Sequence, residues 1–590
     1  MNQSEKEINP KLRIHSWFIF LVFIIFIFVI RLFYVQIIKH DYYQKAALSD
    51  QLKQYELPAN RGTIVAHSSG VLVPLVLNET LFTVYADPKF IVDKAQTSIK
   101  VSDIIGGKTE DLKKMMEKDT RYSVLAKKVS KQQKQKLEGL KLKGIGFRET
   151  VQRTYPQGQL ASQLLGFVND DGIGKYGIEQ ALNETLTGKP GKLKAITDAQ
   201  GVPLASNQDN ILISPKNGSQ LALTIDLGMQ QQLEDILKQG LEAASSKSGG
   251  AVIIDPYSGA IKAMANYPTY NPSDFSKVTD LSVFSNAIVS SPMEIGSTMK
   301  PLTLAAALDQ GVVNKDTTYF DPSVWVIGDS KVVNVEEDGG AATRSMKDIL
   351  QLSLNTGATW LIMQMGGGEI NEKARIAWHN YLVDHYQYGK ETGIEQGYEA
   401  AGSVPSPTDG YGLNIKYANT GFGQGITATP LQLGLAISSV INGGVYYRPY
   451  LIEKYTEPNG LNKDTKPVVV RNNVVKKEVS DTIREYMIET YTKNFRAYNS
   501  QSSNVPRPEF SIGGKTGTAQ EANPDGGYYS NIFNGTYVGF VGGDMPQYVI
   551  SIRVNDPKIP GYAGAKAAAP IFLKLTNMLI DSYGVTPKMH

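Results

Sequence analysis

Three short motifs along the chain carry side chains that together could perform acyl transfer through a serine. The first is Ser297-Thr298-Met299-Lys300, in which the serine and the lysine are three residues apart. On a helix this spacing places both side chains on one face, so the amine of Lys300 could take the proton from the hydroxyl of Ser297. A lysine works as a base only where desolvation or a second cation lowers its pKa. The motif predicts a serine nucleophile with a lysine base.

The two other motifs would complete the same cleft. Ser353-Leu354-Asn355 can add a hydroxyl and an amide to it. Lys515-Thr516-Gly517-Thr518 follows a strand pattern and would place a cation and backbone N–H groups on the opposite wall. Each motif alone is more often a helix cap, a turn or a strand end. All three in this order along one chain are a specific signal for a serine acyltransferase site.

The composition excludes several other kinds of site. The chain has no cysteine, which rules out a catalytic thiol, a disulfide and thiolate ligands for zinc. None of the six histidines lies within ten residues of the motifs, and no G-x-S-x-G sequence surrounds a serine. This leaves open a triad assembled in space, but Lys300 is the nearest candidate base to Ser297. The net charge of +3 does not point to nucleic acid, and 590 residues predict roughly two to four domains.

One segment near the N-terminus is apolar enough to cross a membrane. The chain is almost continuously apolar from Ser16 to Ile38, and about 20 such residues span a bilayer. The segment's one charged residue, Arg31, can extend its charged end toward the interface. A cleaved signal peptide is the alternative, but no small-x-small cleavage site follows. We expect an anchor over residues 16–38 after a cytoplasmic tail over residues 1–15, with an orientation that the flanking charges do not decide.

The remaining chain divides into two regions. Residues 39–215 contain strand patterns at 63–65 and 81–85 and a lysine-rich stretch, 127–143, whose leucines have helical spacing and indicate a solvated helix. A segment rich in Asn, Ser, Pro and Gly, 206–219, predicts the boundary. In the second region, 216–590, helix 301–310 should begin beside Ser297, where its N–H groups favour developing negative charge. The other elements expected are a hairpin of strands 251–255 and 260–265, a strand 510–514 leading into Lys515, strands 536–540 and 548–554, and a closing helix, 567–582.

The chain resembles class B penicillin-binding proteins, the monofunctional D,D-transpeptidases that cross-link peptidoglycan. The resemblance covers nearly the whole chain and includes all three motifs. Further matching sequences are Arg61-Gly62-Thr63-Ile64, Arg153-x-Tyr155-Pro156-x-Gly158, Gly177-Ile178-Glu179, Thr392-Gly393-Ile394 and Gly421-Phe422-Gly423-Gln424-Gly425. The last is interpreted as a packing loop, because no Lys-Ser or Lys-Thr follows it as in a phosphate cradle. Residues 66–70 depart from the D-R-N-G that the family usually has there, which concerns the first region and not the catalysis.

The fold that this resemblance implies is α+β. It consists of a transpeptidase domain like those of penicillin-binding proteins and β-lactamases, with an antiparallel sheet flanked by helices, and the active cleft lies between sheet and helices. This domain, residues 216–590, would stand on a β-rich N-terminal pedestal of the dimerisation type, residues 39–215, behind the one transmembrane helix.

The resemblance also implies a role for each motif residue. Ser297 is acylated with Lys300 as general base, Ser353 relays a proton to the leaving amine, Asn355 holds the ligand's amide, and Lys515 supports Ser353 electrostatically. The residues implied to bind substrate are Thr516, Gly517 and Thr518, of which the two threonines bind its carboxylate. The N–H groups of residues 297 and 518 would form the oxyanion hole.

The function expected from the resemblance is D,D-transpeptidation on the outer face of the cytoplasmic membrane. The substrates are peptidoglycan stem peptides ending in D-Ala-D-Ala, β-lactams acylate the same serine, and no metal or other cofactor is implied. The partners expected are a polytopic membrane glycosyltransferase of the SEDS type and divisome or elongasome proteins, with no nucleic acid. The amide in Ser-Leu-Asn and the compact pedestal favour septal synthesis over elongation.

Two other classes of function compete with this one. A D,D-carboxypeptidase or β-lactamase would share the motifs, although the long pedestal and the anchor are superfluous for a hydrolase. A non-catalytic scaffold should have lost motif residues, and none is lost. A β-lactam sensor would carry further membrane spans and a cytoplasmic effector, whereas only about fifteen residues precede the predicted anchor.

Overall fold

The computed structural model describes residues 10–43, 52–196, 211–334, 340–499, 506–522 and 527–589. These residues belong to two compact units. The first comprises Met1–Asn60 and Gly188–Asn217, and the second comprises Arg61–Thr187 and Gly218–His590. All three motifs lie in the second unit.

The first unit contains the apolar segment and a small sheet. Helix α1 (Pro10–Phe33) continues as a π-helical turn, η1 (Tyr34–Ile38). The antiparallel sheet has the order β1 (Leu52–Leu57), β8 (Gly191–Ile196) and β9 (Ile211–Ile213).

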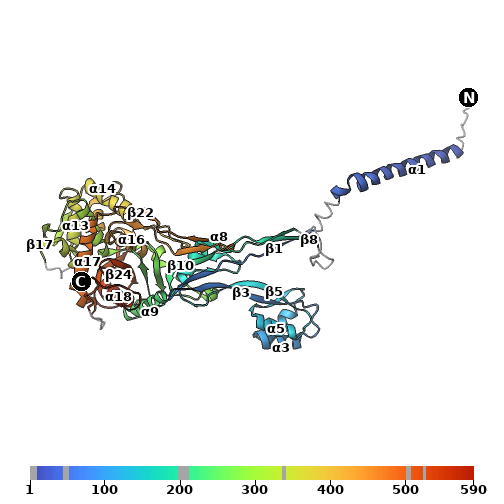
Figure 1. Ribbon diagram of the computed structural model, residues 1–590, viewed down its shortest axis with the longest axis horizontal. Helices are drawn as coiled ribbons and strands as arrows, with labels where there is room; N and C mark the ends of the chain where they lie inside the picture. The colour runs from blue at the N-terminus through green and yellow to red at the C-terminus, as the bar shows by residue number, and fades with distance from the viewer. Residues whose placement is uncertain are drawn as a thin grey trace, which may run out of the picture. The chain divides into compact units, whose positions relative to one another are not determined.

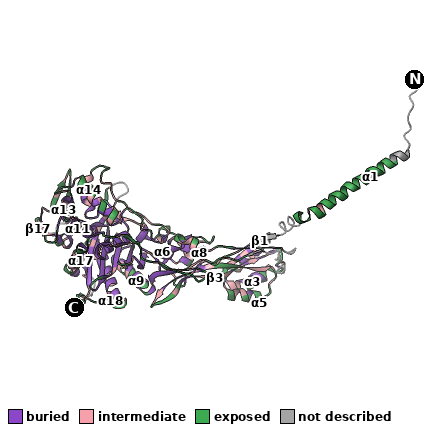
Figure 2. Ribbon diagram, turned by 45° about the horizontal axis from the view of Figure 1, so that its top comes forward, coloured by how far each residue is buried: buried purple, intermediate pink, exposed green. Residues whose placement is uncertain are grey.

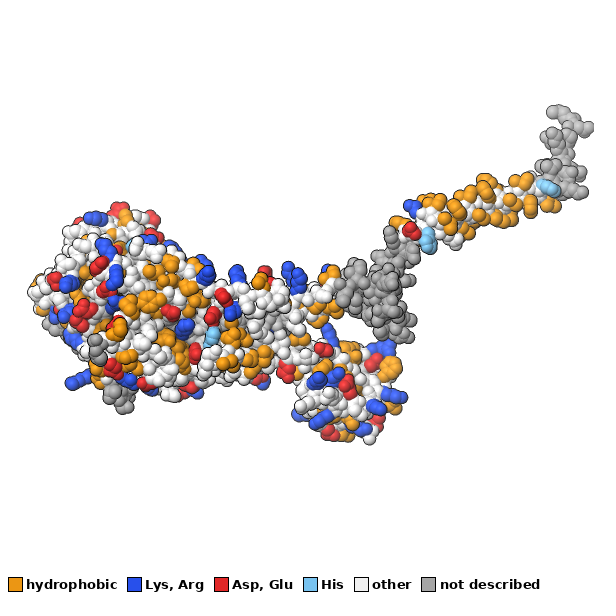
Figure 3. All heavy atoms as spheres, in the orientation of Figure 1, with side chains coloured by type: hydrophobic (Ala, Val, Ile, Leu, Met, Phe, Trp, Pro, Cys, Tyr) orange, Lys and Arg blue, Asp and Glu red, His pale blue; other side chains and the backbone are white. Residues whose placement is uncertain are grey.

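The predicted membrane span lies on one continuous helix. The segment Ile14–Ile38 contains an 18-residue stretch with a mean hydropathy of 3.0, and no part of that stretch is buried within the protein. Figure 2 shows α1 exposed along its described length, and Figure 3 shows that its surface consists mostly of hydrophobic side chains. By length and composition this helix can cross a membrane.

A seven-stranded sheet joins the two regions that the sequence separates. Its order is β21 (Asn462–Asp464), β20 (Ile452–Thr456), β10 (Gln220–Asp226), β2 (Ile64–Ser68), β3 (Val71–Ala86) and β4 (Ser123–Val129), with β5 (Ile145–Thr154) paired to β3. Strand β10 runs parallel to β2, whereas its other neighbour, β20, is antiparallel. The strands predicted at 63–65 and 81–85 lie in β2 and β3. The sheet contains strands from both sides of the boundary predicted between residues 215 and 216. The position of that boundary stays a prediction.

The prediction of a helix over 127–143 is only partly right. The first residues of this stretch, up to Val129, belong to strand β4 and not to a helix. Helix α5 spans only Lys131–Gly139. Ser130 begins this helix with a capping box, in which its side chain accepts from the N–H of Gln133 and the Gln133 side chain accepts from the N–H of Ser130. Leu137 packs into a small core with helices α3 (Lys94–Ile105) and α4 (Thr109–Met116).

A five-stranded antiparallel sheet carries the third motif. Its order is β12 (Ile261–Tyr267), β11 (Ser248–Ile254), β25 (Pro546–Asn555), β24 (Tyr528–Gly542) and β23 (Ser511–Ala522). This arrangement confirms the predicted hairpin and the other strands predicted in the second region. Strand β23 lies at one edge, so one side of its backbone is available for pairing.

Helices cover both faces of this sheet. Successive strand residues point to opposite faces, so Val252 and Ile254 join a core with α16 (Pro430–Ile441), and Ile253 joins a second core with α9 (Leu227–Ala243) and α18 (Ala569–Ser582). Figure 1 shows α9 and α18 beside β24. The expected α+β architecture is confirmed, and the predicted closing helix corresponds to η7 (Gly564–Ala568) with α18.

The remaining helices and strands, most of them short, complete the second unit. In the first half they are α6 (Ser162–Leu165), β6 (Phe167–Val168), β7 (Gly174–Lys175), α7 (Gly177–Ala181), α8 (Asn183–Thr187), η2 (Pro272–Lys277), η3 (Leu281–Phe284), α10 (Ala287–Ser290) and β13 (Met293–Glu294). In the second half they are η4 (Gly296–Met299), α11 (Lys300–Asp309), β14 (Thr318–Asp321), β15 (Val324–Ile327), β16 (Ser330–Val333), β17 (Ala342–Ser345), α12 (Met346–Gln351), α13 (Asn355–Met365), α14 (Glu372–Asn380), η6 (Tyr381–His385), α15 (Leu413–Thr420), β18 (Thr427–Ala428), β19 (Tyr446–Tyr447), β22 (Val469–Arg471) and α17 (Lys477–Tyr498).

Candidate active site

The first motif forms the start of a buried helix. Ser297 lies on the 3₁₀ turn η4, which leads directly into α11, so the helix predicted at 301–310 is confirmed to within one residue. Pro301 fits in the first turn because the N–H that it lacks would have no partner within the helix. The helix is buried from Lys300 to Ala307, which holds the serine and the lysine rigidly against the core.

Lys300 brings the first two motifs together. Its Nζ donates to Ser297 Oγ at 2.8 Å, to Ser353 Oγ at 3.1 Å and to Asn355 Oδ1 at 2.9 Å, and it also contacts the carbonyl of Ser353. The side chain is fully buried, at 0% exposure. The amine is therefore held out of water and within hydrogen-bond distance of the Ser297 hydroxyl.

Ser353 lies between the two lysines. Its backbone adopts a left-handed conformation with a φ of 57°, just before α13 begins at Asn355. Lys515 Nζ also donates to its hydroxyl, at 3.0 Å. A serine oxygen has two lone pairs and can accept from both amines. The three predicted motifs therefore meet at this one hydroxyl.

The third motif forms the edge of the five-stranded sheet. Lys515 pairs with Val538 on β24, and Thr518 pairs with Gly535. Lys515 is only 2% exposed, and its Nζ also donates to the carbonyl of Thr516 at 3.1 Å. The hydroxyl of Thr518 accepts from the N–H of Gly564 at 3.0 Å.

Glycines allow three backbone segments to approach around the serine. A Cβ on Gly517 would lie 2.2 Å from Thr536 Oγ1 and 2.6 Å from the carbonyl oxygen of Ile295. A Cβ on Gly423, whose φ is +85°, would lie 2.1 Å from the carbonyl oxygen of Gly296. The N–H of Gly296 in turn donates to the carbonyl of Gly423 at 3.1 Å. The glycine-rich sequence at 421–425 is thus confirmed as a packing loop.

These elements surround a cavity of about 510 Å³, a size typical of small-molecule sites. The predicted residues that line it are Ser297, Ser353, Asn355, Lys515, Thr516 and Thr518. Lys300 and Gly517 are buried behind this surface. The lining residues that sequence reasoning missed are Gly296, Gln351, Leu352, Phe422, Gln424, Asn494, Ala497, Tyr498, Gln520, Phe533, Tyr562 and Ala565. Within the described ranges, no group of three or more histidine, aspartate or glutamate side chains could hold a metal ion.

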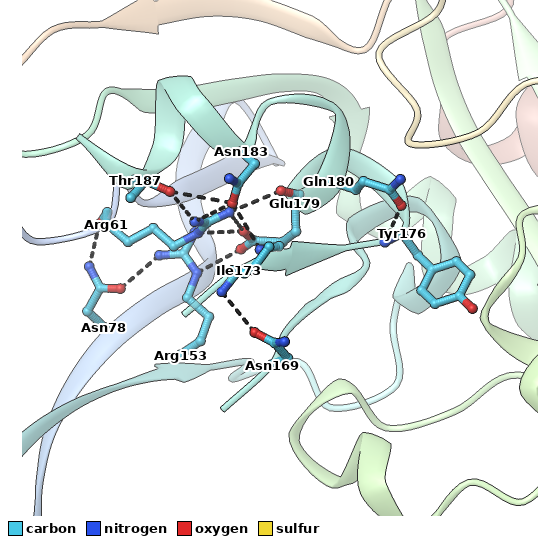
Figure 4. Close-up of polar contacts among 11 residues, drawn as sticks. Arg61, Asn78, Arg153, Asn169, Ile173, Tyr176, Glu179, Gln180, Asn183 and Thr187 are labelled. Carbon is cyan, nitrogen blue, oxygen red and sulfur yellow. Dashed lines mark hydrogen bonds and ion pairs between the residues drawn. The ribbon is translucent and has the colours of Figure 1, made fainter. Parts of the chain in front are cut away.

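The pedestal motifs converge on a different feature, a buried ion cluster (Figure 4). Glu179 is fully buried and accepts from Arg61 Nε and from Arg153 Nε, both at 2.7 Å. Arg61 also donates to Asn183 and Thr187. Removing one partner of such a cluster leaves an uncompensated buried charge, which costs about 3–5 kcal/mol. These motifs support the fold and do not line the cavity.

The chain matches two known domain families, and the motif residues described above lie within the matched regions. The penicillin-binding protein transpeptidase domain matches residues 249–577, more than half of the chain, and the penicillin-binding protein dimerisation domain matches residues 56–223. The chain belongs to the penicillin-binding protein transpeptidase family, with the two-domain organisation of class B. It is a serine-type peptidoglycan D,D-transpeptidase.

Individual relatives agree with this assignment. The chain is 28% identical to stage V sporulation protein D of Bacillus subtilis over 599 residues, which covers 100% of this chain and 88% of that protein. It is 26% identical to the peptidoglycan D,D-transpeptidase FtsI of Escherichia coli over 567 residues, 94% of this chain and 89% of that protein. Penicillin-binding protein 2X of Streptococcus thermophilus has the same fold, with a TM-score of 0.73 at 24% identity over 91% of this chain and 81% of that chain. Penicillin-binding protein 3 of Mycobacterium tuberculosis, solved with aztreonam, gives a TM-score of 0.67 at 24% identity over 90% of this chain and 98% of that chain.

Proposed function

We propose that Ser297 is the nucleophile that takes up the acyl group and that Lys300 is its general base. The observation that carries this proposal is the 2.8 Å contact between Lys300 Nζ and Ser297 Oγ, made by a fully buried lysine. As the serine oxygen bonds to the carbonyl carbon of the terminal D-Ala-D-Ala amide, its proton passes to the amine. The position of the serine at the start of α11 favours the negative charge that develops on the substrate oxygen.

The second step releases D-Ala and forms the acyl-enzyme. The leaving nitrogen needs a proton, and Ser353 can relay one because its hydroxyl lies within hydrogen-bond distance of both Lys300 and Lys515. An amine from a second stem peptide then attacks the ester, displaces Ser297 and forms the cross-link. In this mechanism Asn355 holds the amide of the donor peptide from the other side of the cleft.

Strand β23 would bind the donor peptide. An extended peptide can add to an exposed sheet edge through main-chain hydrogen bonds, and β23 is such an edge. We assign Thr516 and Thr518 to the terminal carboxylate, beside the positive charge of Lys515, and Gly517 to the close approach between this strand and the nucleophile turn. The N–H groups of Ser297 and Thr518 would form the oxyanion hole. Support comes from the close packing of the two backbones, since a Cβ on Gly296 would lie 2.9 Å from the Thr518 carbonyl oxygen.

Acylation by a β-lactam tests the assignment of the nucleophile. A relative of the same fold was solved with aztreonam, which supports the proposal that β-lactams acylate Ser297 here. Fluorescent penicillin should label the full-length protein, and mass spectrometry should place the adduct on the peptide that contains Ser297. Ser297→Ala should abolish the labelling. Labelling that survives this substitution would refute the assignment.

We further propose that the enzyme is a single-pass protein of the cytoplasmic membrane that acts on the outer face in septal wall synthesis. Residues 1–15 would form a cytoplasmic tail, 16–38 the anchor, 39–215 the pedestal and 216–590 the transpeptidase domain. A polytopic glycosyltransferase of the SEDS type, together with divisome proteins, would supply the glycan strands. A fluorescent fusion should concentrate at the septum, whereas a lateral distribution would assign the enzyme to elongation.

A further inference from the structure

A carboxylate just before the nucleophile takes part in none of the steps above. Glu294 ends strand β13, three residues before Ser297. Its Oε1 accepts from the N–H of Gly425 at 2.7 Å and from the hydroxyl of Tyr528 at 2.8 Å. Its Oε2 is buried and has no hydrogen-bond partner among the described residues. Burial raises the pKa of this carboxyl, while the two hydrogen bonds lower it.

These two bonds join three separate parts of the cleft. Glu294 belongs to the segment that leads into the nucleophile turn. Gly425 directly follows Gln424, which lines the cavity from the glycine-rich loop. Tyr528 is the first residue of β24, where it pairs with Ala522 at the end of β23. One carboxylate therefore fixes the spacing between the nucleophile segment, the glycine-rich loop and the far end of the β23–β24 hairpin.

The far end of the hairpin also contributes to the cavity. Gln520 on β23 and Phe533 on β24 line it beyond Thr518. A small β-lactam occupies little more than the serine and the carboxylate site. A stem peptide is longer, and the part that precedes its scissile bond must continue along an edge or wall of the cavity. The wall formed by Gln424, Gln520 and Phe533 is available for this part of the donor.

We propose that Glu294 is a positioning residue that holds this wall at the spacing required by the donor stem peptide, acting through Gly425 and Tyr528. The inference rests on the proposed function, because it takes Ser297 as the acylated residue and β23 as the peptide-binding edge. Glu294 is not a base for the acceptor amine: one oxygen already accepts two hydrogen bonds, and the other is buried.

The test compares two acyl donors on the full-length protein in detergent. One is a synthetic stem pentapeptide ending in D-Ala-D-Ala, and the other is a small chromogenic cephalosporin. The variants are Glu294→Ala, which removes both bonds, Tyr528→Phe, which removes one, and Glu294→Gln, whose amide oxygen can still accept both. Tyr583→Phe is the matched control, because the Tyr583 hydroxyl accepts a 2.9 Å hydrogen bond from Gln232 on the far side of the sheet.

The expected result is a split between the two donors. Glu294→Ala should raise the KM for the pentapeptide about tenfold, the effect of losing a hydrogen bond to a charged group, while cephalosporin acylation changes less than about threefold. Tyr528→Phe should act in the same direction with a smaller factor. Glu294→Gln should restore the KM to within about threefold of the unmodified protein. Tyr583→Phe should change neither the KM for the pentapeptide nor the acylation by the cephalosporin.

Three results would overturn the inference. If Glu294→Gln is as impaired as Glu294→Ala, the ionised group itself is needed, and Glu294 is not a positioning residue. If Glu294→Ala impairs the reactions with both donors by the same factor, the contact supports the whole site and not the donor wall. An unchanged pentapeptide KM in Tyr528→Phe would remove the link to the hairpin, and this variant decides the matter even if Glu294→Ala fails to fold. Failure of the proposed function is a different result, namely no adduct on Ser297 in the unmodified protein.

Discussion

The two lysines of the cleft have different surroundings although both are buried. Lys300 contacts the hydroxyls of Ser297 and Ser353 and the amide oxygen of Asn355. Lys515 contacts the same serine hydroxyl from the strand side and the carbonyl of Thr516. Lys300 lies within hydrogen-bond distance of the Ser297 hydroxyl and can take its proton directly. The amine of Lys515 is placed to supply positive charge.

Arginine substitutions separate these two roles. Lys300→Arg keeps the charge but removes the base, because a guanidinium does not deprotonate near neutral pH. Acylation by a chromogenic β-lactam should therefore fall by at least the roughly 10²–10⁴-fold typical of losing a general base. Lys515→Arg keeps a cation where only a cation is needed, so it should retain measurable acylation. Equal loss in both variants would show that the division of roles is wrong.

At this scale the sequence predicts the motif residues and little else of the site. The structure brings together Ser297, Ser353 and Lys515, which motif order and residue chemistry had already singled out. Glu294 and Tyr528 belong to no motif of the sequence analysis. Their contact depends on a hairpin and a loop that meet only in three dimensions. Residues of α17 that line the cavity, such as Tyr498, look like any other position on an amphipathic helix.

At the scale of elements, the site depends on backbones that approach more closely than side chains permit. Gly423 is the clearest case, since its φ is positive and its missing Cβ leaves room for the carbonyl of Gly296. Gly296, which carries this carbonyl, directly precedes Ser297. The position of Ser297, the proposed nucleophile, is therefore coupled to the packing of the glycine-rich loop.

Alanine at position 423 should affect both stability and acylation. A left-handed backbone costs a residue with a Cβ about 1–2 kcal/mol, and here a clash adds to it. Gly460→Ala is the matched control, because Gly460 also has a positive φ, +83°, but nothing lies within 4 Å of its would-be Cβ. We expect Gly460→Ala to lower the Tm by about 2–4 °C without changing acylation, and Gly423→Ala to lower the Tm further and slow acylation at least about tenfold. If the two variants acylate equally well, the coupling does not exist.

Local patterns predict the helices and hairpins of this chain better than its long-range pairings. The helix after Ser297 and the 251–265 hairpin follow from neighbouring residues, because their capping and turn signals lie within a few positions. The parallel pairing of β10 with β2 joins segments more than 150 residues apart, and no short pattern encodes it. The helix expected from residue 127 begins later because Lys127 and Lys128 are exposed positions of strand β4, which ends only at Val129.

At the scale of the whole molecule, the proposed chemistry favours an orientation that the charges leave open. Peptidoglycan stem peptides are assembled into the wall outside the cytoplasmic membrane, so the proposed topology places the parts of the chain after the apolar helix there. The helix Ile14–Ile38 is long enough to connect them to a short tail on the other side.

Protease accessibility checks this topology. Protease added to intact spheroplasts should digest the protein from about Lys39 onward and leave a small membrane fragment. An engineered tag on the N-terminal tail should survive in intact spheroplasts and disappear only after the membrane is permeabilised. A protected catalytic domain would contradict the assignment, and so would a mature N-terminus that begins after Ile38.

The open edge of β23 has a cost for solubility and folding. An unpaired edge strand of twelve residues is a template on which another chain can add, which is a common route to aggregation. In the proposed binding mode, a proline or a bulge at residues 515–518 would protect the edge but would also block the substrate. Lys515, Thr516 and Thr518 line the cavity, and Lys515 is only 2% exposed, so this part of the edge lies inside the cleft and not on the outer surface. The edge proposed to bind the substrate is thus also one on which another chain could add while the protein folds.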